Sequence, residues 1–190
     1  MRHRLQGNWT KGLAFDLHTV ASVYLGPDEF GHDRFDSTRS EIGELIYQLK
    51  YQRDQSAVPK IIELLSVIKG IENFDAIIPV PSSKARAVQP VDSIASALGK
   101  QRGVRVLTGY LIKEGNAELK GIHNPDERVK ALENTIKISG KEDISGQRVL
   151  LLDDLYRSGA TLNACCNVLK QQAKIADVSV LTMTKTRSNR

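Results

Sequence analysis

The chain has 190 residues, 41% of them hydrophobic and 26% charged, which is enough for one domain with a full core. No apolar run approaches the ~20 residues of a membrane-spanning helix, and the basic N-terminus lacks the apolar core of a secretion signal, so we expect neither a membrane protein nor a secreted one. The net charge of +5 suits an anionic ligand, either a phosphorylated small molecule or a nucleic acid, although a basic solvated surface explains it equally well.

Residues 1–37 are rich in Gly, Asp, His and aromatic residues, and their weak periodicity predicts one or two strands plus loops. Apolar residues then recur at helical spacing from Ile42 to Leu49, and Ser40 is a suitable N-cap for that helix. A second helix is predicted over residues 58–68.

Strands and helices alternate in the rest of the chain. The predicted strands are 75–80, 104–107, 135–139 (an edge strand), 149–152 and 178–183, and the predicted helices are 90–99 (ended by Gly99), 125–134 (N-cap Asn124) and 161–173. Strands separated by helices favour parallel pairing through crossovers. We therefore predict an α/β fold: a central, mostly parallel sheet flanked by helices in residues 38–190, with residues 1–37 as a small N-terminal extension or hood. Residues 109–124 form the longest irregular stretch, and such loops are often functional lids.

The stretch VLLLDDLYRSGATL, residues 149–162, combines a buried strand with chemistry-bearing residues. In open α/β sheets, ligands bind at the carboxyl ends of the strands, where Asp153 and Asp154 are expected. The turn after them supplies backbone N–H groups and hydroxyls at a helix N-terminus, which is a typical phosphate site. The stretch thus offers first carboxylates, which accept hydrogen bonds from hydroxyls, and then groups that donate to a phosphate. A sugar phosphate carries hydroxyls and a phosphate a short distance apart, and so matches this order. The common nucleotide motifs GxxxxGK[ST] and GxGxxG are absent.

The same stretch resembles the phosphoribosyl-pyrophosphate (PRPP) motif of type I phosphoribosyltransferases: four aliphatic residues, two acidic residues and a [ST]-G-x-[ST] turn. More of the chain resembles the ComF-like (competence protein F-like) branch, in which a segment like EIGELIYQLKYQRD (41–54) precedes a strand ending in PVP, here IIPVPSSKAR (77–86). The resemblance covers roughly residues 38–185.

The resemblance implies a role for each matching residue. Asp153 and Asp154 would bind the ribose hydroxyls of PRPP and take part in catalysis, and residues Arg157, Ser158, Gly159, Ala160 and Thr161 would hold the 5′-phosphate. The pyrophosphate would be bound by Ser82, Ser83, Lys84 and Arg86. Mg²⁺ would arrive with PRPP, held mainly by phosphate oxygens and water, without a confident direct side-chain ligand. A nitrogen acceptor would attack C1 of the ribose, and Lys113 or Lys120, with Lys120 as the catalytic candidate, would close on the leaving pyrophosphate.

The chain also departs from the family pattern. The four-cysteine zinc module of many ComF-like proteins is absent, so zinc is not expected, and AVQPVDSIA replaces an RGFNQ-like segment after PVP. Arg157 stands where some purine enzymes carry a carboxylate, which makes ordinary purine salvage doubtful and leaves the acceptor open. The alternative function is a PRPP-sensing or DNA-uptake-associated module without turnover, and a third is hydrolysis or non-productive binding of a related sugar phosphate.

Several residues have a structural and a functional explanation. Cys165 and Cys166 are adjacent, so neither a disulfide framework nor a CxxC metal site is expected; burial is favoured over redox chemistry, and a cytoplasmic setting is the simplest. The basic residues Lys84, Arg86, Lys113 and Lys120 either contact the pyrophosphate or are solvated surface cations. A metal site is conceivable at His18 and His32, which lie near Asp16 and Asp33 in the sequence, but their spacing is not diagnostic. Trp9, Phe15, Tyr24 and Tyr156 fit either core packing or walls of a ligand site. A homodimer stays open.

Overall fold

The computed structural model describes residues 2–82, 88–115, 122, 124–140 and 142–187. Its central sheet has five strands, in the spatial order β1 (His3–Arg4), β2 (Gly12–Leu17), β9 (Asp177–Lys185), β8 (Arg148–Tyr156) and β5 (Ala76–Pro79). The last four run parallel, and only β1 joins antiparallel. The predicted α/β class with a mostly parallel sheet is therefore confirmed.

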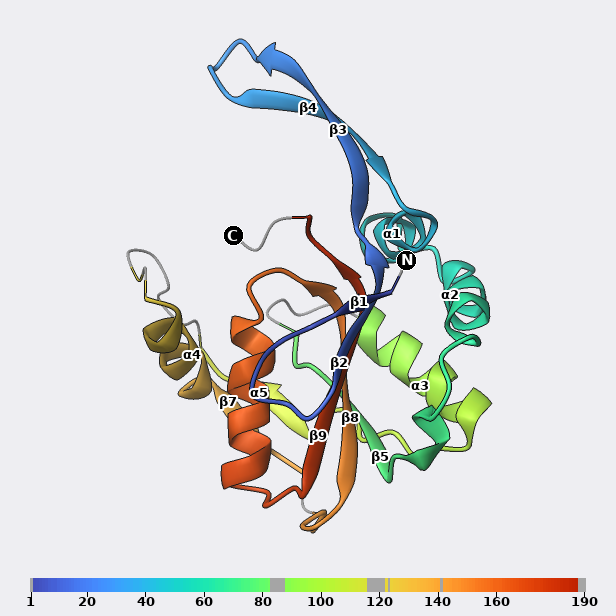
Figure 1. Ribbon diagram of the computed structural model, residues 1–190, viewed down its shortest axis with the longest axis vertical. Helices are drawn as coiled ribbons and strands as arrows, with labels where there is room; N and C mark the ends of the chain where they lie inside the picture. Colours follow the sequence, from blue (N-terminus) through green and yellow to red (C-terminus); the bar gives the residue numbers. More distant parts are fainter. Residues whose placement is uncertain (1, 83–87, 116–121, 123, 141, 188–190) are drawn as a thin grey trace.

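Helices cover both faces of the central sheet (Figure 1). One face carries α1 (Glu41–Tyr47), a π-helical turn (Gln48–Gln52), α2 (Ala57–Leu65), a 3₁₀ turn (Ile71–Asn73) and α3 (Pro90–Arg102). The other face carries α5 (Ala160–Gln171), and α4 (Pro125–Glu133) packs on α5. Because successive strand residues point to opposite faces, Leu150 and Leu152 of β8 pack toward the α1–α3 side, and Val149 and Leu151 pack toward the α5 side. No helix among the described residues is both long and apolar enough to cross a membrane.

Both predicted N-caps are confirmed. The hydroxyl oxygen of Ser40 accepts from the Gly43 N–H at 3.0 Å, and Asn124 Oδ1 accepts from the Asp126 N–H at 2.9 Å. Each cap satisfies a backbone donor that has no partner inside its own helix. The local sequence therefore determines where these two helices begin.

The predicted helix ends are less accurate. The helix predicted to stop at Gly99 continues to Arg102, and Gly103 follows it in the left-handed region, with φ of +67°. Gly99 serves close packing instead, because a Cβ there would collide with the side chain of Val106. The helix predicted over 58–68 ends three residues early, at Leu65. A glycine can mark either a helix end or a tight approach, and composition alone does not distinguish the two.

Two predicted strands have a different place in the fold. Instead of a strand over 104–107, there is one isolated parallel bridge between Val106 and Ile77. The predicted edge strand is β7 (Ile136–Ile138), but it leaves the central sheet and pairs antiparallel with β6 (Leu111–Lys113). Since β6 lies inside residues 109–124, that stretch is not wholly irregular as predicted.

Residues 1–37 contain two different kinds of β-structure. Strand β2 belongs to the central sheet, where it pairs with β9. Strands β3 (Thr19–Pro27) and β4 (Asp33–Arg39) form a separate antiparallel hairpin, which projects away from the body at the top of Figure 1. Whether this segment acts as a hood stays a prediction.

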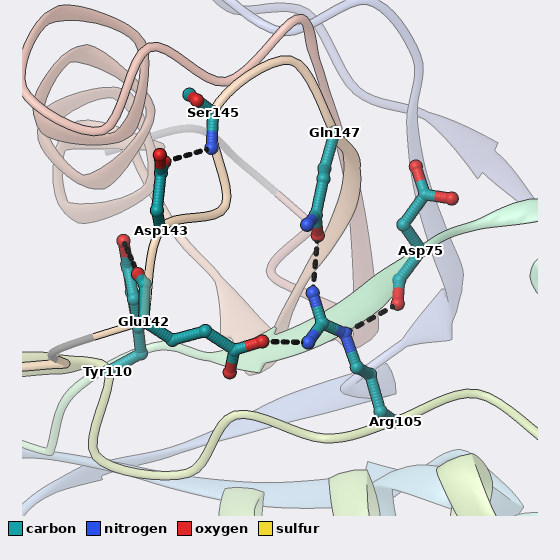
Figure 2. Close-up of polar contacts among 7 residues, drawn as sticks. All are labelled: Asp75, Arg105, Tyr110, Glu142, Asp143, Ser145 and Gln147. Carbon is teal, nitrogen blue, oxygen red and sulfur yellow. Dashed lines mark hydrogen bonds and ion pairs between the residues drawn. The ribbon is translucent and has the colours of Figure 1, made fainter.

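A solvent-exposed arginine forms hydrogen bonds with the residues that precede the parallel strands β5 and β8. Figure 2 shows Arg105 between Asp75, which precedes β5, and Gln147, which precedes β8. Its guanidinium donates to the Asp75 carbonyl at 3.1 Å and to Gln147 Oε1 at 2.6 Å, and it forms an ion pair with Glu142. These contacts lie at the end of the sheet opposite to the expected ligand site.

Candidate functional site

The two adjacent aspartates lie within β8, two residues before its end. The strand was predicted to stop at Leu152, but it continues to Tyr156, and its pairing with β9 is regular through Asp153, opposite Thr182. Alternation along the strand therefore sends Asp153 and Asp154 to opposite faces of the sheet. This separation reduces the repulsion that two neighbouring carboxylates would otherwise feel.

Asp154 is buried and paired. Its carboxylate lies 2.7 Å from the ammonium nitrogen of Lys50, which belongs to the π-helical turn after α1, and only 6% of the residue is exposed. The backbone carbonyl of Asp154 accepts from the hydroxyl of Thr184 at 2.9 Å, and the same hydroxyl lies 3.2 Å from Nδ1 of His18. Burial, assisted by Arg39 and Lys50, lowers the pKa of His18, which favours the neutral ring.

Asp153 has a different environment. Its side chain is partly exposed and lines a cavity, and its Oδ1 accepts from the Asp154 N–H at 2.8 Å. Burial, with a further contribution from the neighbouring Asp154 carboxylate, raises the pKa of Asp153 to about 8. This shift favours the protonated form of Asp153. Strongly shifted carboxyls in a cavity are typical of functional sites.

The turn after β8 leads directly into helix α5. Gly159 precedes Ala160, the first helical residue, and has φ of +76°, a conformation that favours glycine. A Cβ at Gly159 would also approach the ring of Tyr156 to 2.8 Å. The hydroxyl of Ser158 lies 3.5 Å from the Ala160 N–H. The turn therefore directs the free N–H groups of a twelve-residue helix toward the end of the sheet.

A cavity of about 670 Å³ joins these parts at the carboxyl ends of β5 and β8. This volume is in the range of sites for small molecules and cofactors. Its lining is Lys50, Tyr51, Pro79, Val80, Pro81, Ser82, Gln89, Pro90, Val91, Asp92, Gly109, Leu111, Ile112, Lys113, Asp153, Asp154, Leu155, Arg157 and Thr161. Five separate segments of the chain, within residues 50–51, 79–82, 89–92, 109–113 and 153–161, thus meet where an α/β fold usually binds its ligand.

The structure brings part of the predicted site together. Asp153, Asp154, Arg157, Thr161 and Ser82 all line this cavity. The predicted site residues Ser158 and Gly159 belong to the adjoining turn, Ala160 begins α5, and none of the three lines the cavity. Lys113, for which a surface position was favoured, is half-buried and lines it as well. The predicted residues Ser83, Lys84, Arg86 and Lys120 lie outside the described residues.

Sequence reasoning missed three ionisable residues of the cavity lining: Lys50, Tyr51 and Asp92. Burial raises the pKa of Asp92. A signal for Lys50 and Tyr51 was available, because they lie in the segment EIGELIYQLKYQRD that carries part of the family resemblance. The pair of adjacent aspartates also required a nearby cation, and Lys50 supplies it.

The remaining candidates lie mostly in the core. Cys165 and Cys166 are buried in α5, and burial raises the pKa of both thiols, that of Cys166 to about 12, which agrees with the predicted structural role. Tyr156 and Trp9 are buried against each other, with ring centroids 6.4 Å apart. Phe15 packs against the core, whereas Tyr24 is exposed on the hairpin. Among the described residues, no cluster of three His, Cys, Asp or Glu side chains could hold a metal ion, so His18 and His32 form no such site.

Comparisons with known proteins give matches in structure only. No protein-family model matches the sequence, and neither does any curated protein. Among solved structures, the chain is similar to adenine phosphoribosyltransferase from Thermoanaerobacter pseudethanolicus, with 18% identity, a TM-score of 0.48, and coverage of 88% of this chain and 95% of that one. It is also similar to orotate phosphoribosyltransferase from Aeropyrum pernix, with 15% identity, a TM-score of 0.45, and coverage of 87% of this chain and 73% of that one. A third similar structure is hypoxanthine phosphoribosyltransferase from Trypanosoma cruzi, with 15% identity, a TM-score of 0.42, and coverage of 77% of this chain and 71% of that one. Likeness at this level concerns the fold alone, and function depends on the residues of the site.

Proposed function

We propose that this chain is a phosphoribosyltransferase, which transfers the 5-phosphoribosyl group of PRPP to a nitrogen acceptor with release of pyrophosphate. The observation that carries the proposal is the cavity, which brings the aspartates of β8, the start of α5 and the end of β5 to one place. The order of groups in VLLLDDLYRSGATL, carboxylates before a phosphate-binding turn, supplies the chemical identity of the ligand.

The ribose would lie against the carboxyl ends of the strands. Asp153 is exposed to the cavity, so as a carboxylate it can accept hydrogen bonds from the two ribose hydroxyls. Asp154 also lines the cavity, but its carboxylate is engaged by Lys50. In this proposal Asp154 positions Lys50 at the wall of the site and contributes to ribose binding from the opposite face of the strand.

The 5′-phosphate would lie at the N-terminus of α5. Helix N–H groups without internal partners and the positive end of the helix dipole both favour a dianion there. Arg157 and Thr161 line the cavity at this point and add a cation and a hydroxyl. In the proposed site Ser158, Gly159 and Ala160 complete the cradle with hydroxyl and backbone donors.

The pyrophosphate would extend toward the end of β5. Ser82 lines the cavity there, and the resemblance assigns the following Ser83, Lys84 and Arg86 to the same group. The described donors fit a Mg²⁺ that is carried by the diphosphate, because they offer few carboxylates and no three-ligand cluster. In this proposal the carboxylate of Asp153, which lines the cavity, would contact such an ion, and the ion would supply positive charge that stabilises the leaving pyrophosphate.

The reaction needs a nitrogen lone pair to attack C1 of the ribose while the bond from C1 to the pyrophosphate oxygen breaks. The electron pair of that bond leaves with the pyrophosphate, and the acceptor nitrogen then loses its proton to solvent or to a nearby base. Lys113 lies at the wall of the cavity, and Lys120 follows in the same segment; either would stabilise the negative charge that develops on the leaving group.

Turnover is tested by measuring pyrophosphate release from Mg²⁺ and PRPP with a panel of nucleobases and amines. A transferase releases pyrophosphate only with its acceptor, whereas hydrolysis releases it without any. If PRPP raises the melting temperature but no acceptor gives pyrophosphate, the ComF-like sensing alternative replaces the enzyme proposal. Saturation at ~100 times Kd should add about 2.7 kcal/mol to the free energy of unfolding.

A further inference from the structure

The β3–β4 hairpin exposes an unusual amount of apolar surface. It projects from the body as a two-stranded ribbon (Figure 1), and neither outer edge of it pairs with another strand within the described part of the chain. Its large exposed apolar side chains are Val20, Val23, Tyr24, Leu25, Phe30 and Phe35. Contiguous apolar surface on a folded protein commonly marks a contact with another protein.

A ribbon of this kind is poorly stabilised alone. An isolated two-stranded hairpin is marginal in water, and an open strand edge is a template for pairing with another chain. Strand β3, TVASVYLGP, carries no charge, whereas β4, DRFDSTR, carries charges of both signs that restrict how its edge can pair. The hairpin therefore has both the apolar surface and the free hydrogen-bonding edges of an interface.

The charges of the hairpin restrict what could cover it. Residues 19–39 contain four carboxylates and two arginines, a net charge of −2, although the whole chain carries +5. A nucleic acid or an anionic membrane would be repelled by this segment. A protein strand that carries charges of both signs is favoured as the partner instead.

Strand β4 provides that alternation within itself. It reads DRFDSTR, so Arg34 and Asp36 flank Phe35. When two copies of β4 pair antiparallel about a two-fold axis at Phe35, Arg34 of each lies opposite Asp36 of the other. Axes at Arg34 or at Asp36 would instead place like charges opposite each other, which is destabilising.

We propose that the hairpin is a dimerisation arm, in which β4 pairs with β4 of a second copy of this chain about a two-fold axis at Phe35. The two hairpins then form one four-stranded antiparallel sheet. An isologous contact of this kind closes on itself and leaves no open end for further growth at that edge.

The aromatic residues agree with the same register. Tyr24 lies opposite Phe35 within the hairpin, with ring centroids 5.4 Å apart, and the Tyr24 hydroxyl donates to Asp33 at 2.9 Å. Pairing at Phe35 extends this contact into a row of four rings across four strands, Tyr24 and Phe35 from each copy. Cross-strand aromatic pairs are among the stabilising pairs of antiparallel sheets.

The test is sedimentation equilibrium of the full chain and its charge variants from about 1 to 300 µM. The wild-type mass should rise toward twice the 21.0 kDa of one chain. Asp36→Arg alone and Arg34→Asp alone should each weaken dimerisation about tenfold or more, because symmetry makes every substitution act twice. The double variant, Arg34→Asp with Asp36→Arg, restores opposite charges and should dimerise as wild type does.

Phe35→Ser removes the ring at the two-fold axis and should also weaken dimerisation, and Phe30→Ser is its matched control. Phe30 is 76% exposed and Phe35 is 56% exposed, but Phe30 lies in the turn outside the pairing segment, so its removal should leave the dimer unchanged. A wild type that stays monomeric to 300 µM overturns the proposal, as does a dimer that neither reversal weakens. Failure of the double variant to recover, with its thermal melt unchanged, overturns the Phe35 register.

Discussion

Two strands of equal length show opposite relations between sequence and environment. Strands β3 and β8 each have nine residues. In β8 an aliphatic run is buried on both faces by helices and continues into the aspartates of the site. In β3 the apolar residues Val23, Tyr24 and Leu25 face solvent. The body of the protein buries its β-structure within one chain, whereas the hairpin leaves its own uncovered.

The difference separates two kinds of information in the sequence. A strand that the chain itself covers, such as β8, is recognisable from its hydrophobic run, and its end indicates a site. A strand that the rest of the chain leaves uncovered, such as β3, looks like part of an irregular extension. Substitutions in β8 should therefore change the stability of the monomer, and substitutions in β3 and β4 should change association.

Leu151→Ala is expected to have the largest effect on stability. Leu151 is fully buried, so its truncation should lower the free energy of unfolding by about 3 kcal/mol, through lost burial and the cavity that remains. Val23→Ala in β3 is the comparison, since Val23 is 61% exposed and should change monomer stability by no more than about 0.5 kcal/mol. Urea unfolding at low protein concentration measures both. Equal losses in the two variants would contradict the proposed division between body and hairpin.

Lys50→Met should have the next largest effect. The substitution leaves the buried Asp154 carboxylate without its cation and should lower the free energy of unfolding by about 2 kcal/mol, less than for a fully buried pair because the Lys50 side chain is 23% exposed. Lys100→Met, at an exposed position near the end of α3, is the control and should be nearly neutral. In an Asp154→Asn background most of the Lys50 effect should vanish. A loss of the same size in that background would show that Lys50 acts through packing alone.

The protonation of Asp153 predicts a loss of stability that is graded with pH. Because its folded-state pKa is raised from 3.8 to about 8, the folded protein holds a proton that the unfolded chain releases between these values. The contribution of Asp153 to stability is therefore fully present below pH 3.8 and is lost as pH rises through about 8, by at most about 1.4 kcal/mol per pH unit. Comparing the pH dependence of unfolding in wild type and Asp153→Asn isolates this effect. Identical slopes would mean that Asp153 ionises normally.

Much of the fold follows from local sequence patterns. The strand–helix alternation gave the fold class, and the N-caps Ser40 and Asn124 gave two helix starts, because these features act over a few residues. VLLLDD predicted in the same way that two aspartates lie near the carboxyl end of a buried strand, where they line the cavity. These are patterns in which each residue is interpreted together with its immediate neighbours.

The remaining features depend on contacts between distant segments. Pairing of β6 with β7 outside the central sheet, and the role of Gly99 against Val106, come from tertiary packing. The ion pair of Lys50 with Asp154 joins residues more than a hundred positions apart. The two adjacent aspartates suggested a nearby cation. Their sequence spacing from the π-helical turn that carries Lys50 could not identify that turn as its source. Alternation in β8, which separates the two carboxylates, became apparent only once the strand was seen to continue past Leu152.

The central claim is a PRPP site at the carboxyl ends of β5 and β8, and calorimetric titration of the wild type and Asp153→Asn with PRPP and Mg²⁺ tests it most directly. Asp153 faces the cavity and, unlike Asp154, is not the partner in the Lys50 ion pair, so its substitution should spare the fold. The proposal predicts one binding site in the wild type, an affinity that rises as Asp153 ionises toward pH 8, and an affinity about tenfold or more weaker in Asp153→Asn. Absence of binding at millimolar PRPP, or equal affinity in the two proteins, would contradict it.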